Sequence, residues 1–253
     1  MARSFPRFLV LVAMFFGGFA PLAQAGRVKI EPDVPAGLQD FQGMQPFLTG
    51  VPIPEGELAV GDPVALVDAR GEPVLSQFEV AATWRSDHKH VRWLLVDGLT
   101  AVKDGRGEPV YLVYGPDAKG LTVQPPGGIE AVQSATGIVV GTGDGAVKLG
   151  PGGVGVGQLV LVDGAGNRFS SEDVEPVLEK SGPVRAVAKW SGMFRRADGA
   201  PVASYLIRAR FHPKTRMTRV FVTLTWLTDD KTEIGSLTFV PARSGGAGEV
   251  AVG

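Results

Sequence analysis

Short runs of alternating apolar and polar residues recur along this chain, and none shows the three-to-four-residue repeat of an amphipathic helix. The clearest run spans residues 183–194, where one face of a strand would be apolar and the other mixed. The apolar face would carry Val184, Ala186, Ala188 and Trp190, and the mixed face Arg185, Val187, Lys189 and Ser191. One packed and one partly solvated face is typical of a β-sandwich. The pattern therefore predicts an all-β protein.

Further strands are predicted between turns rich in glycine, proline and aspartate. They span residues 62–68, 73–84, 91–96, 99–102, 109–114, 129–140, 146–149, 158–162, 201–211, 217–226 and 237–240. Residues 26–50 contain Pro32, Pro35 and Pro46. Because proline cannot donate to a sheet ladder, this segment is predicted to be an edge strand or an extended arm.

A change in composition divides the chain. Residues 119–128 interrupt the strands with Gly120, Pro125, Pro126, Gly127 and Gly128. Such a segment is typical of a linker between domains. We therefore predict a first β domain over residues 26–118, a second β domain over residues 129–242, and a tail rich in glycine and alanine over residues 243–253.

Composition and charge narrow the class of protein. A hydrophobic content of 44% is sufficient for a core, and 35 glycines with 19 prolines favour a turn-rich β chain. The formal charge of −1 provides no field that would gather nucleic acid, so no nucleic-acid partner is expected. With no cysteine the chain has no disulfide. No pattern indicates a cofactor.

The first 25 residues are typical of a secretory signal peptide. Arg3 and Arg7 precede an apolar run over residues 8–22, and Ala23-Gln24-Ala25 forms a small-x-small cleavage signature. The alternative is a membrane anchor, but roughly 15 apolar residues fall short of the ~20 that a spanning helix needs. We expect cleavage after Ala25 and a periplasmic or secreted protein with no membrane attachment.

Residues 84–97 concentrate the candidate chemistry, with two of the four tryptophans and two of the three histidines. Residues 91–96 are predicted to form a buried strand entered through a charged turn. Trp84, beside polar residues, is the better candidate for stacking on a sugar ring, whereas Trp93 and Trp190 are expected in the core. The candidate ligand-binding residues are Trp84, Arg85, Asp87, His88, His90 and Arg92.

Other chemistries are less well supported. His88 and His90, with His212, could ligate a metal, but no cysteine or particular carboxylate completes the set, so no metal is assigned. The glycine run at residues 141–157 lacks a P-loop ending and is predicted to be a loop with a strand inside it. No nucleophile elbow is present, and the acidic pairs 172–173 and 229–230 lie in polar turns. No catalytic residue is assigned.

Five segments together resemble a known family. They are FLTGVPIPEG (47–56), LVDARGEPVLSQFEVAATW (66–84), VRWLLVDG (91–98), YLVYG (111–115) and EKSGPVRAVAKWSG (179–192). In this order they resemble the N-terminal half of exo-rhamnogalacturonan lyase and YetA-like proteins. The resemblance implies a RIFT-type β-barrel followed by an antiparallel β-sandwich. The turn at residues 86–90 is longer and more basic than the Asp-Gly-Ser turn of that family.

In the resembling lyases an α/α-toroid follows the sandwich and carries the main active-site machinery. Only thirteen residues follow residue 240 here. We therefore expect an exported non-catalytic β protein, a carbohydrate-associated module related to pectin or rhamnogalacturonan, whose partner is a polysaccharide or oligosaccharide. The alternative is a truncated or split polysaccharide lyase that works with a separate catalytic domain. A metal-dependent hydrolase built on the histidines is a third possibility.

Overall fold

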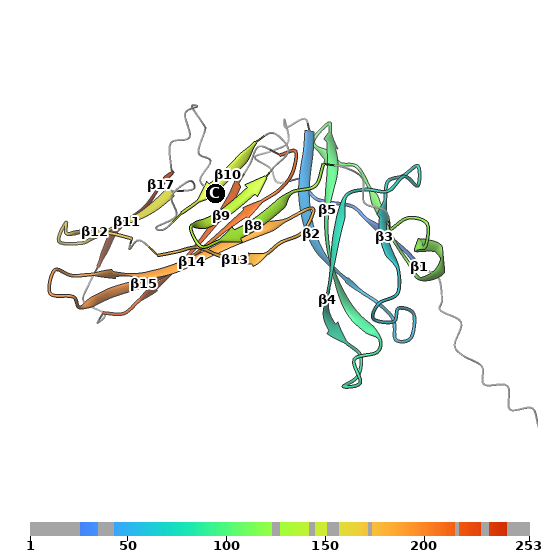
Figure 1. The fold of residues 1–253 in the computed structure, drawn as a ribbon, viewed down its shortest axis with the longest axis horizontal. Helices are drawn as coiled ribbons and strands as arrows, with labels where there is room; N and C mark the ends of the chain where they lie inside the picture. The colour runs from blue at the N-terminus through green and yellow to red at the C-terminus, as the bar shows by residue number, and fades with distance from the viewer. Residues whose placement is uncertain are drawn as a thin grey trace, which may run out of the picture.

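The computed structural model describes residues 26–34, 43–122, 127–141, 145–150, 157–171, 174–215, 218–228 and 233–241. Within these ranges the protein is all-β, with one short 3₁₀ turn, η2 (Gly115–Ala118). The strands form two lobes (Figure 1). The predicted signal peptide, the predicted tail and residues 123–126 of the predicted linker lie outside the described residues. The described residues contain no apolar helix of membrane-spanning length.

The first lobe consists of two antiparallel sheets that face each other, one of three strands and one of four. One has the order β1 (Gly26–Ile30), β7 (Val110–Tyr114), β3 (Val64–Val67); the other has the order β2 (Gly43–Pro52), β5 (Val91–Lys103), β4 (Ser76–Thr83), with β6 (Arg106–Gly107) beside β5. The core between the sheets includes Leu66, Leu94, Val96 and Leu112. Neither sheet closes on itself.

Two sequence predictions for this lobe have different outcomes. The segment 26–50, predicted from its prolines to be an edge strand or an extended arm, contains two strands of different sheets, β1 and β2, and both are outer strands. The prediction of separate strands at 91–96 and 99–102 is wrong, because β5 runs without interruption through Asp97 and Gly98. Both residues pair with β2 on one side and β4 on the other, so this aspartate-glycine pair lies in a central strand rather than in a turn.

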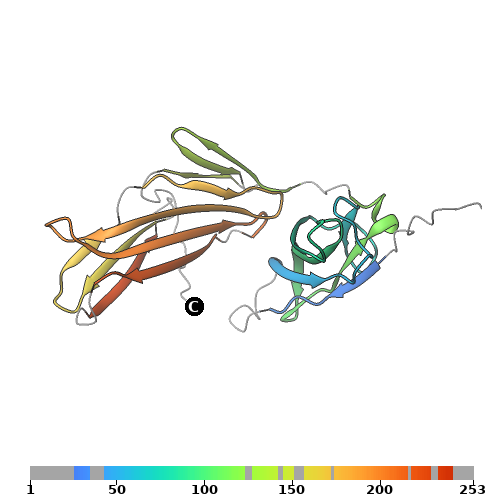
Figure 2. The same ribbon diagram turned by 90° about the horizontal axis from the view of Figure 1, so that it is seen from below.

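The second lobe contains three antiparallel sheets arranged as a sandwich (Figure 2). Its four-stranded layer has the order β13 (Val177–Lys180), β14 (Ala186–Arg195), β15 (Pro201–Phe211), β16 (Thr218–Trp226). The opposite layer combines β10 (Ala146–Leu149), β9 (Gly137–Gly141), β8 (Glu130–Ser134) with β12 (Arg168–Ser170), β11 (Gly157–Asp163), β17 (Ile234–Pro241). The core between the layers includes Ile138, Leu161, Trp190, Ile207 and Phe211.

The alternation predicted for residues 183–194 is confirmed on its apolar face. Val184, Ala186, Ala188 and Trp190 are buried. The opposite face differs from the prediction, because Arg185 and Val187 are buried too. β14 begins at Ala186, and Arg185 just before it is covered by the first lobe through Asp97 and Gln77.

The two lobes meet at a junction made by the outer face of the β2-β5-β4 sheet. Leu75, Leu99 and Met44 of the first lobe pack with Val184 of the second. Beside them the buried Arg185 guanidinium donates from Nη2 to Oδ2 of Asp97 at 2.9 Å.

Three further contacts flank that ion pair. Lys180 forms an ion pair with Glu79, the backbone N of Arg185 donates to Oε1 of Gln77 at 3.3 Å, and the Gln77 side chain lies against Gly182. Apolar packing and side-chain pairing therefore fix one lobe on the other.

Candidate functional site

The candidate residues of the sequence lie together at the tip of the β4–β5 hairpin, which projects from the first lobe (Figure 1). Backbone N of Trp84 donates to the His90 carbonyl at 3.0 Å, and N of His88 donates to the Arg85 carbonyl at 3.1 Å. His88 has a φ of 54°, and its Nδ1 lies 2.9 Å from Oγ1 of Thr83. These contacts give the turn a defined shape.

The Trp84 indole is fixed from two directions. Its Nε1 donates to the carbonyl of Ile53 at 2.9 Å, and the guanidinium carbon of Arg92 lies 5.2 Å from its ring centroid. Ile53 follows β2, and β5 lies between β2 and β4, so the side chain reaches across β5. The residue is nevertheless 38% exposed. Trp84 is therefore an oriented aromatic group on the surface, as the sequence predicted.

The charged residues of the turn are paired locally. Nε of Arg85 donates to Oε1 of Glu55 at 2.7 Å. Oδ1 of Asp87 accepts from the backbone N of Lys89 at 3.2 Å, and the two side chains are 4.0 Å apart. Exposed ion pairs of this kind add little stability. They reduce the net positive charge that the sequence suggested for this turn, so the aromatic ring is its main distinguishing feature.

The expectation that Trp93 lies in the core is wrong, because this residue is 42% exposed. The register of β4 against β5 shifts on both sides of Ala82, so Val91 and Leu94 are both buried although they lie three residues apart. Arg92 and Trp93 between them both face outward. A strict two-residue alternation cannot anticipate this β-bulge.

The Trp93 ring lies against Gly50 of the neighbouring strand β2. A Cβ atom at Gly50 of β2 would come within 2.2 Å of the indole Nε1. Leu48, two residues earlier on the same face of β2, is also exposed. The outer face of the β2-β5-β4 sheet thus carries two exposed tryptophans and an exposed leucine beyond the part that contacts the second lobe.

We expect Gly50→Ala to displace the Trp93 ring, because the added methyl group occupies the position of the indole. The Trp93 emission should shift to longer wavelength, and overpacking should lower the free energy of unfolding by about 1–2 kcal/mol. Steady-state fluorescence with acrylamide quenching measures the first effect and urea unfolding the second. Gly120→Ala, where a Cβ meets nothing within 4 Å, is the control. If the spectral change persisted in a Trp93→Phe background, the assignment to Trp93 would be wrong.

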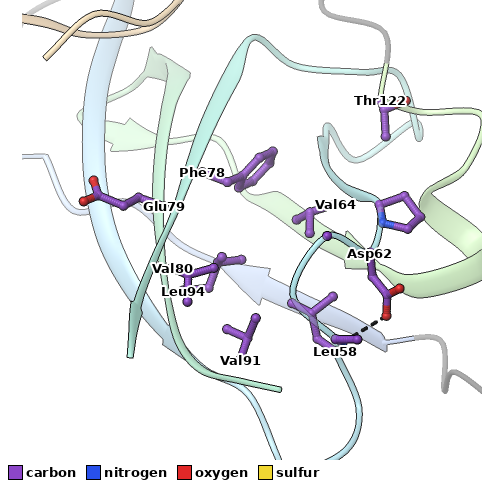
Figure 3. A pocket seen from close by; sticks show the side chains of 12 residues that line it. Leu58, Asp62, Val64, Phe78, Glu79, Val80, Val91, Leu94 and Thr122 are labelled. Atoms are coloured by element: carbon purple, nitrogen blue, oxygen red, sulfur yellow. Dashed lines mark hydrogen bonds between the residues drawn. The ribbon is translucent and has the colours of Figure 1, made fainter. Parts of the chain in front are cut away.

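A pocket of about 340 Å³ opens in the first lobe between β3 and β4 (Figure 3). Its apolar lining is Leu58, Val64, Phe78, Val80, Val91 and Leu94. The Asp62 carboxylate at its rim accepts from the backbone N of Ala59 at 2.9 Å, which closes a loop. The Glu79 carboxylate points away, toward Lys180. The pocket can hold a small apolar group and presents no set of groups for chemistry.

The histidines do not assemble a metal centre. His88 and His90 lie at the hairpin tip, whereas His212 is buried in the second lobe with Nδ1 at 3.2 Å from the Val184 carbonyl. No group of three His, Cys, Asp or Glu side chains that could hold a metal ion occurs in the part of the chain that the structure describes. The acidic pairs 172–173 and 229–230 lie outside that part.

The hydroxyl of Tyr114 has a strongly shifted pKa. It donates to Oε2 of Glu57 at 2.6 Å, and burial together with this carboxylate raises the pKa of Tyr114 to about 12. A phenol with such a pKa stays protonated at neutral pH and cannot act as a general base there. Tyr114 therefore serves to link β7 to the 53–60 loop.

No protein-family model matches the chain, and no curated protein is similar to it. The fold defines an all-β protein of two lobes, and the described residues present an aromatic surface as their most distinctive feature. The polar neighbours of Trp84 correctly indicated an exposed ring, whereas the apolar run around Trp93 wrongly predicted a buried one. No local signal marked Trp93, because its outward position depends on the bulge beside Ala82 in the pairing of β4 with β5.

Proposed function

We propose that this chain is an exported, non-catalytic β protein that binds polysaccharide of the pectin or rhamnogalacturonan type through the outer face of the first lobe. The observation that carries the proposal is the fixed, exposed indole of Trp84, held between the Ile53 carbonyl and Arg92. Flat apolar rings with one polar handle suit the C–H faces of sugars, and fixing the ring beforehand reduces the entropy lost on binding. The exposed Trp93 extends this surface.

The proposal includes the finer fold. We propose that residues 26–118 form a RIFT-type barrel and residues 129–242 a β-sandwich, as the resemblance implies. The two facing sheets of the first lobe and the layered second lobe support this order of domains. The neighbouring Arg85, Asp87, His88 and His90 would frame the tryptophan through their paired turn.

We expect Trp84→Ala to weaken retention on a pectic polysaccharide by about tenfold, because removing a stacking ring costs about 1–1.5 kcal/mol. Affinity electrophoresis in gels containing rhamnogalacturonan measures the effect. Trp84→Phe keeps a ring but loses the hydrogen bond to Ile53, so it should weaken retention less. Phe221→Ala removes an equally exposed ring from the second lobe and should not change it.

Equal retention of the wild type and Trp84→Ala on every pectic gel, or no retention of either, would contradict the proposed site. Circular dichroism of each variant separates lost binding from lost folding. A non-pectic glucan gel tests whether the surface distinguishes the class of polysaccharide.

The second candidate is a truncated or split polysaccharide lyase. The observation that favours it is the succession of two β lobes along the chain, which is what a barrel followed by a sandwich would require. The two candidates differ in one assay, the formation of unsaturated uronate products from rhamnogalacturonan. The non-catalytic protein forms none, whether or not a separately encoded helical domain is added, whereas the split lyase forms them when that domain is present.

A further inference from the structure

Strand β17 forms a free edge of the second lobe. It is hydrogen-bonded to β11 and to no other strand in the part of the chain that the structure describes. The ladder is regular from Gly157 and Pro241 to Val162 and Ser236, and it shifts only beside Asp163. No strand of the described residues pairs with the backbone donors and acceptors on the other side of β17, and a further strand would bind there.

The side chains of β17 are unusually exposed for a strand of this composition. Ile234, Leu237 and Val240 are all exposed, and only Phe239 packs against the core. Leu237 pairs with Leu161 of β11, which is fully buried. The two leucines are on the same, core-facing side of the sheet, but Leu161 is buried and Leu237 is exposed to solvent. Apolar side-chain surface therefore remains exposed at this edge.

The opposite layer is open on the same side. β16 is also an outer strand, and only residues 227–233 connect it to β17 (Figure 2, orange and red). Its core-facing Val222 and Leu224 are half-buried, whereas Tyr205 and Ile207 beside them on β15 are buried. The side of the sandwich bordered by β16 and β17 is therefore incompletely covered.

β17 also lacks the protection that the other edges have. Sheet edges are normally guarded by charged residues or prolines that prevent pairing with another chain. β17 reads IGSLTFVP, with no charged residue and with proline only at its last position. The other outer strands in the described sheets carry a charge or an internal proline, except β3, which has four mostly buried residues. Examples are Glu79 in β4, Glu130 in β8, Lys148 in β10 and Arg219 in β16.

We propose that two copies of this chain associate by antiparallel pairing of their β17 strands, which makes a continuous sheet β12-β11-β17-β17-β11-β12. A two-fold axis pairs β17 of one copy with β17 of the other. A charged side chain in the strand would then lie near the same charge of the second copy, and β17 has no charged side chain. Leu237 and Phe239 lie on one face of β17 and meet the same apolar residues of the second copy. The contact closes after two copies.

This pairing does not involve the exposed Trp84 and Trp93, because they belong to the first lobe, whereas β17 belongs to the second. The proposal does not depend on sugar binding. A dimer would carry two copies of the tryptophan surface, and simultaneous engagement of both would increase retention on a polymer that repeats its binding unit.

The test is sedimentation equilibrium of the purified full chain over an approximately hundredfold range of concentration, because self-association is concentration-dependent. We expect the wild type to shift from monomer to dimer. Leu237→Lys should weaken the dimer by at least about a hundredfold, since like charges juxtaposed in an interface are strongly unfavourable. Thr238→Lys is a second variant, with the added charge on the face of β17 opposite to Leu237. It should also weaken the dimer, without disturbing the core-facing side of the strand.

Val132→Lys places the same charge on β8, an outer strand of another sheet where Val132 is 62% exposed, and should leave the dimer unchanged. Hydrogen exchange adds a local readout, because β17 amides should gain protection as the concentration rises. A wild type that stays monomeric, an association unaffected by both β17 variants, or protection that appears elsewhere instead would each overturn the proposal.

Discussion

Replacing Arg185 by methionine is expected to lower the free energy of unfolding by about 3–5 kcal/mol, because it leaves the Asp97 carboxylate buried without its partner. Asp97 is 2% exposed and its Oδ2 accepts from Arg185 at 2.9 Å. Urea unfolding followed by circular dichroism measures the change. Arg70→Met breaks the exposed ion pair with Asp68 and serves as the control, for which no measurable change is expected.

The double variant Arg185→Met with Asp97→Leu distinguishes the cost of an orphaned charge from the net value of the pair. Burial raises the pKa of Asp97, although Arg185, Lys180 and Arg210 oppose the shift. Oδ1 of Asp97 and Nε of Arg185 are buried without a hydrogen-bond partner in the described residues. The pair is therefore incompletely compensated, and the double variant should recover most of the lost stability. If the double variant were as unstable as Arg185→Met, the loss of stability would come from altered packing at the junction and not from the unpaired charge of Asp97.

His212 is expected to make the protein less stable in acid. Burial lowers the pKa of His212 to about 4, and the nearby Arg219, Arg185 and Arg210 act in the same direction. The Val184 carbonyl can only accept, so the neutral imidazole carries its proton on Nδ1. With an unfolded pKa of about 6.5, the unfolded chain binds more protons at this residue than the native protein between about pH 6.5 and pH 4.

The stability contributed by neutral His212 is therefore present above pH 6.5 and is lost as the pH falls through that window. The loss amounts to about 3 kcal/mol by pH 4, from 1.36 kcal/mol per pH unit. His212→Asn keeps a donor but cannot titrate. Unfolding of wild type and variant between pH 7.5 and pH 4 measures the difference, with His88→Asn at the exposed tip as the control for removing a histidine. A parallel decline of His212→Asn and the wild type would assign the acid sensitivity to other groups.

The class of fold followed from the sequence because alternation and turn residues are local signals. Val184, Ala186, Ala188 and Trp190 face the core as their spacing predicted. Pro46 similarly indicated an outer strand, and β2, which contains it, lies at the edge of its sheet. These features depend on the backbone of one segment, so a single sequence contains enough information to predict them.

The remaining features depend on contacts between distant segments. The bulge near Ala82 turns Trp93 outward, and the close approach of its ring requires Gly50, about forty residues earlier in the chain. Arg185 sits on the predicted solvated face but is covered by the first lobe. The six candidate ligand-binding residues between positions 84 and 92 lie together, because they belong to the tip of one hairpin. His212, which was considered with them as a metal ligand, lies in the second lobe.

The ion pair at the junction has a consequence for how this sequence can vary. Asp97 and Arg185 are 88 positions apart in the chain, yet a change at either one alone leaves a charge stranded in the interior. We therefore expect a substitution at one of the two positions to be tolerated only together with a compensating substitution at the other.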